Sequence, residues 1–261
     1  MRTSWRAFPT SPAAAPGALL RIDAGAGIAT ACTTRLGGSS TGALASLNLS
    51  TRTDDRAETV AANRARILDG LDVAGARWVQ GEQIHGAEVG VVTDASEAVI
   101  PGVDALITDR PGVALAVLVA DCVPILLVDR AHPRIGVVHA GWRGLAAGVV
   151  DATIARMDSP TIAAFIGPSI GPCCFEVGDE VADAMCAAFD PSVRRERTPR
   201  AHIDLWRASA LALRRNQIGE IGMAAACTRC EPHRWFSHRA GSSGRQALVA
   251  AITSDGPGHR L

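Results

Sequence analysis

The chain has 261 residues, of which 48% are hydrophobic and 20% charged, the composition of an ordinary globular protein with a sizeable core. Its 26 basic side chains balance 26 acidic ones without a basic run, which argues against a nucleic acid or an anionic membrane surface as the partner. We therefore expect a small-molecule ligand.

Apolar runs and cysteines indicate the cellular compartment. The first residues lack the continuous apolar stretch of a secretory signal, so the predicted location is the cytoplasm. The apolar run 113–128 is interrupted by Asp121 and Pro124, which favours two buried strands over a membrane-spanning helix. Seven cysteines, an odd number, predict reduced thiols rather than a disulfide framework, and some of them are candidate metal ligands.

The hydrophobic pattern predicts one domain over residues 21–261, preceded by a Pro/Ala-rich lead-in over 1–20, since no repeat or long linker divides the chain. In chain order we expect a strand over 25–35, a Gly/Ser-rich loop over 35–50, a helix over 56–71, strand-type ends of 78–92, strands over 104–109, 113–119, 125–129 and 135–139, a helix over 145–157, a strand over 161–167, helices over 179–189 and 204–217, a strand over 222–228 and a helix over 244–252.

Capping residues and strand number refine this picture. Asp54 or Asp55 is expected to cap the helix over 56–71, and Asp204 is expected to cap the helix over 204–217. Strands outnumber simple βαβ crossovers, so we predict an α+β fold in which mixed β-sheets form a sandwich-like core flanked by helices, rather than a Rossmann pattern.

Three potential metal ligands interrupt predicted core strands beside turn residues: His85 in QIHG, Cys122 in ADCVP and His139 in VVHAGW. Two imidazoles and a thiolate suit zinc, and three protein ligands leave one tetrahedral position open, as catalytic zinc sites do. The spacings are long, so hydrogen-bonded core histidines and an inert thiol are an alternative. A second alternative is a cysteine hydrolase in which Cys122 and His139 form a nucleophile pair. A third is a binding protein whose metal has a fourth protein ligand.

Two further segments suggest polar ligand contacts. The first backbone amides of the helix after HAGWRG, together with Arg143, could grip a phosphate or carboxylate, although Arg143 could equally cap a neighbouring element. The loop TTRLGGSSTG and the asparagine after it offer Arg35, Ser39 and Asn48 for contacts with a sugar or phosphate, with a solvated loop as the alternative.

The remaining cysteine pattern is a weaker metal signal. Cys227 and Cys230 form a C-x-x-C pair, and Cys173 and Cys174 are adjacent in the chain. A lone C-x-x-C with a vicinal pair lacks the second spaced pair of a zinc ribbon. Core packing is therefore the favoured interpretation.

The motifs QIHG, ADC-x-P and HAGWRG, in this order and with TTRLGG, DALITD, IGPSIGPCCFEVG, HIDL, FSHR and GRQA, resemble the laccase-domain family from Thr30 to Ile252. Its members carry the name multicopper polyphenol oxidase and are regarded as zinc-dependent purine nucleoside phosphorylases. The resemblance implies an α+β sandwich like that of the cytotoxic-necrotizing-factor-like cysteine hydrolases, one of them a bacterial deamidase toxin. It implies zinc ligands and catalytic residues at His85, Cys122 and His139, and candidate substrate contacts at Arg35, Ser39, Asn48, Gln83 and Arg143.

The implied reaction is phosphorolysis of adenosine, inosine, guanosine and methylthioadenosine to the base and a (deoxy)ribose 1-phosphate, with adenosine deamination as a side activity. The implied partners are purine nucleosides and inorganic phosphate, and the expected state is a monomer or weak homo-oligomer. Copper is disfavoured, because a multicopper centre needs many imidazoles, commonly as His-x-His, and the seven histidines form no such pair. The alternative is a cysteine hydrolase or amidase that uses Cys122 and His139 and acts on peptidoglycan precursors.

The sequence departs from the family pattern at two places. Thr53 replaces the usual glycine before the acidic pair, and His238 with Arg239 replaces the usual double arginine. Both changes concern loops around the expected site rather than its metal ligands.

Overall fold

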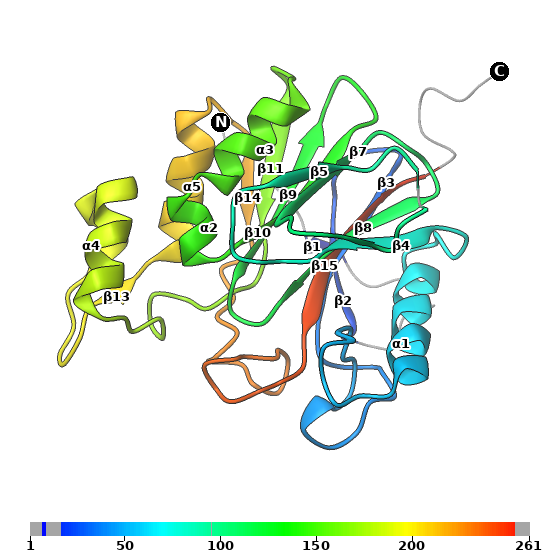
Figure 1. Cartoon of the computed structure of the whole chain (residues 1–261), viewed down its shortest axis with the longest axis horizontal. Coiled ribbons are helices and arrows are strands. Elements are labelled where there is room, and N and C mark those ends of the chain that lie inside the picture. The colour runs from blue at the N-terminus through cyan, green and yellow to red at the C-terminus, as the bar shows by residue number, and fades with distance from the viewer. Residues whose placement is uncertain (1–6, 9–16, 95, 254–261) are drawn as a thin grey trace.

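The computed structural model describes residues 7–8, 17–94 and 96–253. Within them, two mixed β-sheets pack face to face, and a small two-stranded sheet lies beside them (Figure 1). The larger sheet has the order β1 (Ala7–Phe8), β2 (Leu19–Ile22), β3 (Ile28–Thr33), β15 (Gln246–Ile252), β8 (Val113–Val119), β4 (Arg77–Gly81) and β6 (Val99–Ile100). The smaller sheet has the order β14 (Ile221–Met223), β11 (Ile162–Ile166), β9 (Val123–Asp129), β10 (Ile135–Ala140), β7 (Ala105–Thr108) and β5 (Val89–Val91).

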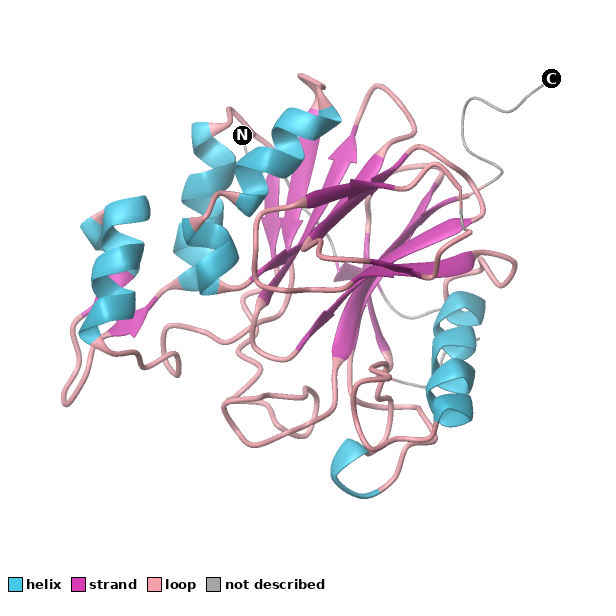
Figure 2. Ribbon diagram, in the orientation of Figure 1, coloured by secondary structure: helices cyan, strands magenta, loops and turns pink. Residues whose placement is uncertain are grey.

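The helices lie on the two outer faces of this sandwich (Figure 2). They are α1 (Ala57–Gly70), α2 (Trp142–Ala146), α3 (Val149–Met157), α4 (Asp179–Ala188) and α5 (Leu205–Arg215), with single 3₁₀ turns η1 (Gly42–Leu44) and η2 (Pro191–Val193). The two-stranded sheet pairs β12 (Arg194–Arg195) with β13 (His202–Ile203). None of the helices in the described ranges combines the length and apolar character needed to cross a bilayer.

Alternation along the strands creates three apolar layers. Between the sheets, Leu115 and Val117 of β8 share a cluster with Leu126 and Val128 of β9. On the outer face of the larger sheet, α1 covers small side chains, most of them alanines, in β8 and β15. Burial of each large aliphatic side chain contributes about 1.5–3 kcal/mol before conformational entropy is counted.

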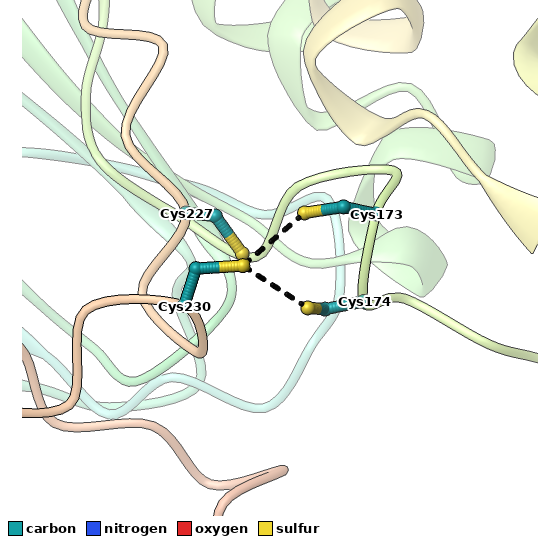
Figure 3. Close-up of side chains that lie close together, drawn as sticks. All are labelled: Cys173, Cys174, Cys227 and Cys230. Atoms are coloured by element: carbon teal, nitrogen blue, oxygen red, sulfur yellow. Dashed lines mark hydrogen bonds between the residues drawn. The ribbon is translucent and has the colours of Figure 1, made fainter.

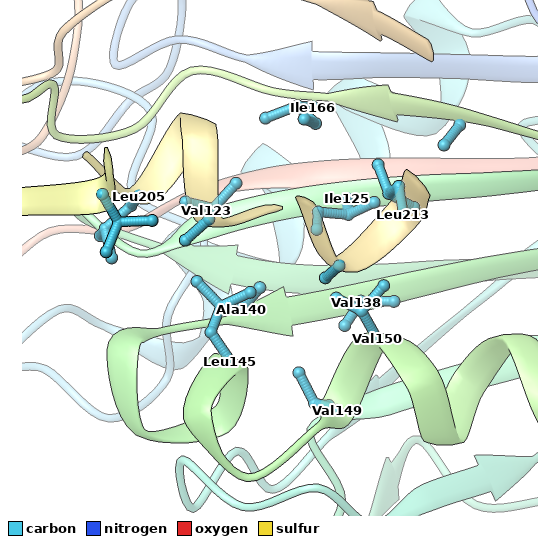
Figure 4. Close-up of a cluster of buried hydrophobic side chains, with 14 of the residues drawn as sticks. Val123, Ile125, Val138, Ala140, Leu145, Val149, Val150, Ile166, Leu205 and Leu213 are labelled. Atoms are coloured by element: carbon cyan, nitrogen blue, oxygen red, sulfur yellow. The ribbon is translucent and has the colours of Figure 1, made fainter. Parts of the chain in front are cut away.

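The third apolar layer joins the smaller sheet to four helices. Figure 4 shows Val123 and Ile125 of β9 beside Leu205 and Leu213 of α5, with residues of α2 and α3 completing the cluster. The order helix, sheet, sheet, helix confirms the predicted α+β sandwich. The strands expected at 113–119, 125–129 and 135–139 are β8, β9 and β10.

The prediction of a helix over 244–252 is wrong, because Gln246–Ile252 form β15, which pairs antiparallel with both β3 and β8. All seven residues of β15 are buried. Its alanines favour a helix locally, but burial on both faces of a central strand overrides that propensity. The helix expected over 145–157 is interrupted, because Gly148 adopts a left-handed φ of 84° between α2 and α3.

The capping predictions have different outcomes. Asp204 is the N-cap of α5 and accepts a hydrogen bond from the backbone N–H of Arg207 (2.9 Å), as expected. The N-cap of α1 is Arg56, not Asp54 or Asp55. Part of the expected lead-in over 1–20 belongs to β1 and β2, which pair with each other, and residues 1–6 and 9–16 lie outside the described residues. The division into a lead-in and one domain stays a prediction.

Candidate metal centre and cleft

His85, Cys122 and His139 lie together where the chain passes between the two sheets. His85 is in the connection from β4 to β5, Cys122 is in the turn from β8 to β9, and His139 is in β10. Their candidate ligand atoms all lie within 4.8 Å of one another. The imidazole rings are T-shaped, with centroids 4.8 Å apart. Residues separated widely in the sequence therefore form one cluster of two nitrogen donors and one sulfur donor.

A buried carboxylate, Asp104, fixes both histidines. Its Oδ1 accepts hydrogen bonds from Nδ1 of His139 (2.7 Å) and from the backbone N–H of His85 (3.0 Å). Its Oδ2 accepts from the backbone N–H groups of Ile84 (3.0 Å) and Gly86 (2.8 Å). These bonds hold His85 at a left-handed φ of 62° and leave Nε2 of His139 as the available ligand atom. Asp104 was not a candidate from the sequence, although it begins the quoted motif DALITD.

Gly141 allows the three donors to meet. It precedes α2 with an ordinary φ of −71°, so its requirement is space rather than backbone freedom. A Cβ atom at this position would lie 2.8 Å from Nδ1 of His85 and 3.1 Å from Sγ of Cys122. Only glycine fits against this cluster without displacing a donor.

The three side chains shift one another's protonation equilibria. Burial would raise the pKa of Cys122, but His139 and His85 lower it to about 6. Burial would lower the pKa of His139, but Cys122 and Asp104 raise it to about 9. The thiol of Cys122 is therefore readily converted to the thiolate, which is the form that binds metals and attacks electrophiles.

The cluster forms part of the wall of a cleft of about 510 Å³, within the ~300–1,000 Å³ typical of small-molecule sites. Three cationic or titratable side chains, Arg52, His238 and Arg245, also line it. The remaining lining residues are Ser50, Thr51, Thr53, Gln80, Gly81, Gln83, Val99, Leu118 and Ala120. The cleft thus combines a metal-type cluster with positive charge, which suits an anionic or polar ligand.

Arg245 is the more rigid of the two arginines in the cleft. Its guanidinium donates to the backbone carbonyls of Ser243 (2.8 Å) and Gly244 (2.9 Å). Burial lowers its pKa, and the nearby Cys122 and Asp121 oppose that shift. Arg52 is exposed and forms a 2.7 Å ion pair with Glu82. Neither arginine was a candidate from the sequence, although Arg52 directly precedes Thr53 and Arg245 belongs to the motif GRQA.

Two of the expected substrate contacts lie in or directly behind the cleft. Gln83 lines it, and its amide exchanges two hydrogen bonds with the backbone of Leu118 (2.7 and 2.8 Å). Asn48 is fully buried, and its Oδ1 accepts from the backbone N–H of Arg245 (3.1 Å). Asn48 therefore positions the segment that carries Arg245.

The other three expected contacts do not line the cleft formed by the described residues. Arg35 donates to the carbonyls of Ala45 and Pro232 and stacks on Phe236. Ser39 donates to Asn63. Arg143 is exposed and lies over the ring of the adjacent Trp142, 4.3 Å from its centroid.

The donor set fits a thiophilic metal ion. Two imidazoles and a thiol of low pKa are ligands that zinc commonly takes in proteins. The carboxylate of Asp104 accepts a hydrogen bond from His139, as carboxylates do behind metal-binding histidines. The same atoms could act differently without a metal. Cys122, His139 and Asp104 then form a thiol, base and carboxylate array of the kind used in nucleophilic catalysis.

Comparison with known proteins identifies relatives with the same fold. The purine nucleoside phosphorylase YlmD of Geobacillus stearothermophilus is 37% identical over 242 residues, covering 84% of this chain and 88% of the relative. The crystal structure of YlmD from Geobacillus stearothermophilus superposes with a TM-score of 0.85 at 36% identity, covering 90% of this chain and 96% of that one. An adenosine deaminase named RL5, from an unknown prokaryotic organism, is 38% identical over 180 residues, covering 62% and 69% of the two chains.

The match to a family is equally extensive. The family described as multi-copper polyphenol oxidoreductase laccase matches residues 29–253, which include the whole smaller sheet, the larger sheet apart from β1, β2 and the first residue of β3, and every donor of the cluster. The laccase-like family expected from the sequence motifs is therefore the correct one. This chain belongs to the multi-copper polyphenol oxidoreductase laccase family.

Proposed function

We propose that this chain is a purine nucleoside phosphorylase, which cleaves adenosine, inosine, guanosine and methylthioadenosine with inorganic phosphate. The observation that carries the proposal is the meeting of His85, Cys122 and His139 in a cleft that also contains Arg52 and Arg245. A phosphate dianion and a polar nucleoside suit such a cleft in charge and size. The name of the relative YlmD, a purine nucleoside phosphorylase, supports the same reaction.

We assign zinc as the metal held by His85, Cys122 and His139. Three nitrogen and sulfur ligands favour zinc over hard cations, and the absence of any His-x-His pair from the sequence argues against a multicopper centre. When bound, zinc supplies a Lewis acid at the wall of the cleft. Asp104 keeps the proton of His139 on Nδ1, so that Nε2 remains a ligand.

The cationic side chains of the cleft bind and orient phosphate. Arg245 is held by its own backbone contacts and offers a preorganised charge, whereas Arg52 lies at the exposed side and can reorient. A phosphate oxygen forms a bond to the anomeric carbon of the sugar as the bond to the purine nitrogen breaks. The purine leaves with the electron pair and takes up a proton, and the sugar passes through an oxocarbenium-like state that the phosphate charge stabilises.

Deamination of adenosine is the proposed side activity. It requires attack of water on the base rather than attack of phosphate on the sugar, so the nucleoside must bind with its base toward the metal cluster. The relative RL5, an adenosine deaminase by name, supports this second mode.

The test measures metal content and turnover of inosine and adenosine, with and without phosphate, in the wild type and in Cys122→Ala. We expect stoichiometric zinc at this site, loss of that zinc in the variant, and base release that requires phosphate. Cys186→Ala, which changes a half-buried cysteine on α4, is the matched control and should behave as wild type. A metal-free protein that catalyses hydrolysis without phosphate and loses this activity when Cys122 is alkylated would instead establish the cysteine hydrolase.

A further inference from the structure

Four cysteines, none of which lines the cleft, gather at a second place (Figure 3). Cys173 and Cys174 lie in the connection from β11 to α4, and Cys227 and Cys230 lie in the connection from β14 to β15. Their sulfur atoms all lie within 4.8 Å of one another. Packing in the core, which the sequence favoured, describes Cys227 and in part Cys174, but Cys173 and Cys230 are exposed.

The sulfur distances match a tetrathiolate metal site better than a disulfide. Sγ of Cys230 is 3.5 Å from Sγ of Cys173 and 3.4 Å from that of Cys174. A zinc–sulfur bond of ~2.3 Å places two sulfurs of a tetrahedron about 3.8 Å apart. A disulfide requires ~2.05 Å. All seven cysteines of the sequence, each among the described residues, are free thiols.

The backbone directs these sulfurs toward one point. The N–H groups of Cys230 (3.2 Å) and Glu231 (3.3 Å) donate to the carbonyl of Cys227, which closes a tight turn around the C-x-x-C pair. The N–H of Gly171 donates to Sγ of Cys227 (3.2 Å), which fixes the position of this sulfur. A Cβ on Gly171 would lie 2.8 Å from the ring of Trp206 and 3.2 Å from Sγ of Cys173, so glycine lets this loop pass between the Trp206 ring and the cysteines.

We propose that Cys173, Cys174, Cys227 and Cys230 bind a Zn²⁺ ion in a closed structural site, separate from the metal centre of the cleft. Four thiolates in a tetrahedral arrangement are typical of zinc or of iron–sulfur clusters, and a single ion fits sulfurs that all lie within 4.8 Å. Since the protein supplies four ligands, no position is open for a substrate.

This site joins two segments that support the cleft. The bridge between Ser169 and Cys227 already pairs the two loops, and the ion would lock them together. Thr228, between the paired cysteines, donates its hydroxyl to Asp121 (2.6 Å), the residue before Cys122. The N–H of Ile170 donates to the carbonyl of the same Asp121 (3.0 Å). The four-cysteine site therefore holds, from two sides, the turn that presents Cys122.

Cadmium NMR of the purified full-length chain tests the assignment, because the resonance of bound cadmium depends on how many sulfurs coordinate it. After replacement of zinc by cadmium, we expect one resonance typical of four thiolates and a second typical of two nitrogens and one sulfur. Cys122→Ala should remove the second resonance and keep the first. Cys230→Ser should remove the first, whereas Cys186→Ser should keep both.

Metal analysis gives the complementary result. Zinc in the Cys122→Ala protein should equal one ion per chain and should fall to background when Cys230→Ser is added. The absence of a four-sulfur resonance in the wild type, iron in place of zinc, or a disulfide among these cysteines would overturn the proposal. Because the wild-type spectrum is decisive by itself, poor folding of a variant leaves the test intact. Failure of the phosphorylase assay would not affect it, since no readout here is activity.

Discussion

Replacing Asp104 by asparagine tests how the proposed metal centre of the cleft is held. The carboxylate accepts four hydrogen bonds, two at each oxygen. Asparagine has nearly the same shape but only one acceptor oxygen, and its NH₂ group is a donor. Whichever way the amide is placed, the NH₂ group meets two N–H groups that previously donated to an oxygen.

The expected loss follows from these bonds. A hydrogen bond to a charged group contributes about 1.5–3 kcal/mol, so loss of two should lower the free energy of unfolding by about 3 kcal/mol or more. If the amide oxygen keeps the bonds to Ile84 and Gly86, the imidazole of His139 must accept from the NH₂ group at Nδ1 and carry its proton on Nε2. That tautomer cannot bind a metal through Nε2, and zinc affinity should fall about 10–100-fold.

The assay is competition for zinc with a chelator of known affinity, alongside urea unfolding. Asp129→Asn is the matched control, because Asp129 is also buried and accepts bonds from Ala131, His132 and Thr161. Asp129 is the last residue of β9, whereas Cys122 directly precedes the first residue of β9. Asp129 therefore lies roughly 20 Å from Cys122 along the strand. Both variants should lose stability, and only Asp104→Asn should lose zinc affinity. Equal zinc affinity in the two variants would refute the role given to Asp104.

Three further predictions concern the same cleft. Gly141→Ala should reduce metal content and turnover, because its new methyl carbon would lie 3.1 Å from the sulfur of Cys122. Gly178→Ala is the control and should change neither quantity, because Gly178 is an N-cap with similar backbone angles and a Cβ there would have no atom within 4 Å. Arg52→Gln should raise the KM for phosphate several-fold. The free energy of unfolding should change by less than about 1 kcal/mol, because the ion pair that is lost is exposed. Arg56→Gln removes a similar exposed ion pair outside the cleft lining and should leave KM unchanged. In metal-free protein, alkylation of Cys122 by iodoacetamide should slow as pH falls through about 6. The two imidazoles lower the pKa of this thiol to about 6, and only the thiolate reacts. Mass spectrometry of the labelled peptide measures the rate.

The ligand cluster was predictable because its members stand beside residues that interrupt strands. His85, Cys122 and His139 each follow or precede a turn, and soft donors at such positions are unusual enough to suggest a site. Asp104 was not predictable in the same way, since its contacts with His139 and the loop of His85 depend on how β5, β7 and β10 align. Arg245 was missed because the segment that carries it was assigned to a helix.

The error over 244–252 has a physical origin. Local sequence favours a helix wherever alanine and leucine are frequent and β-branched residues are few. In β15, however, Ala247 and Ala251 are small because α1 covers that face of the sheet, and Leu248 faces the other sheet. The four cysteines were underestimated for a related reason, because pairing of Ser169 with Cys227 joins two loops that are far apart in the sequence.

The course of the chain between the two sheets has a consequence for folding. His85 and Cys122 lie in connections that leave the larger sheet for the smaller one, whereas His139 belongs to the smaller sheet. A folding intermediate with both sheets formed but not yet docked would hold these donors apart. The ion would therefore bind only after docking, and its binding free energy would stabilise only the docked state. During refolding, metal uptake should follow the appearance of secondary structure and coincide with closure of the sandwich.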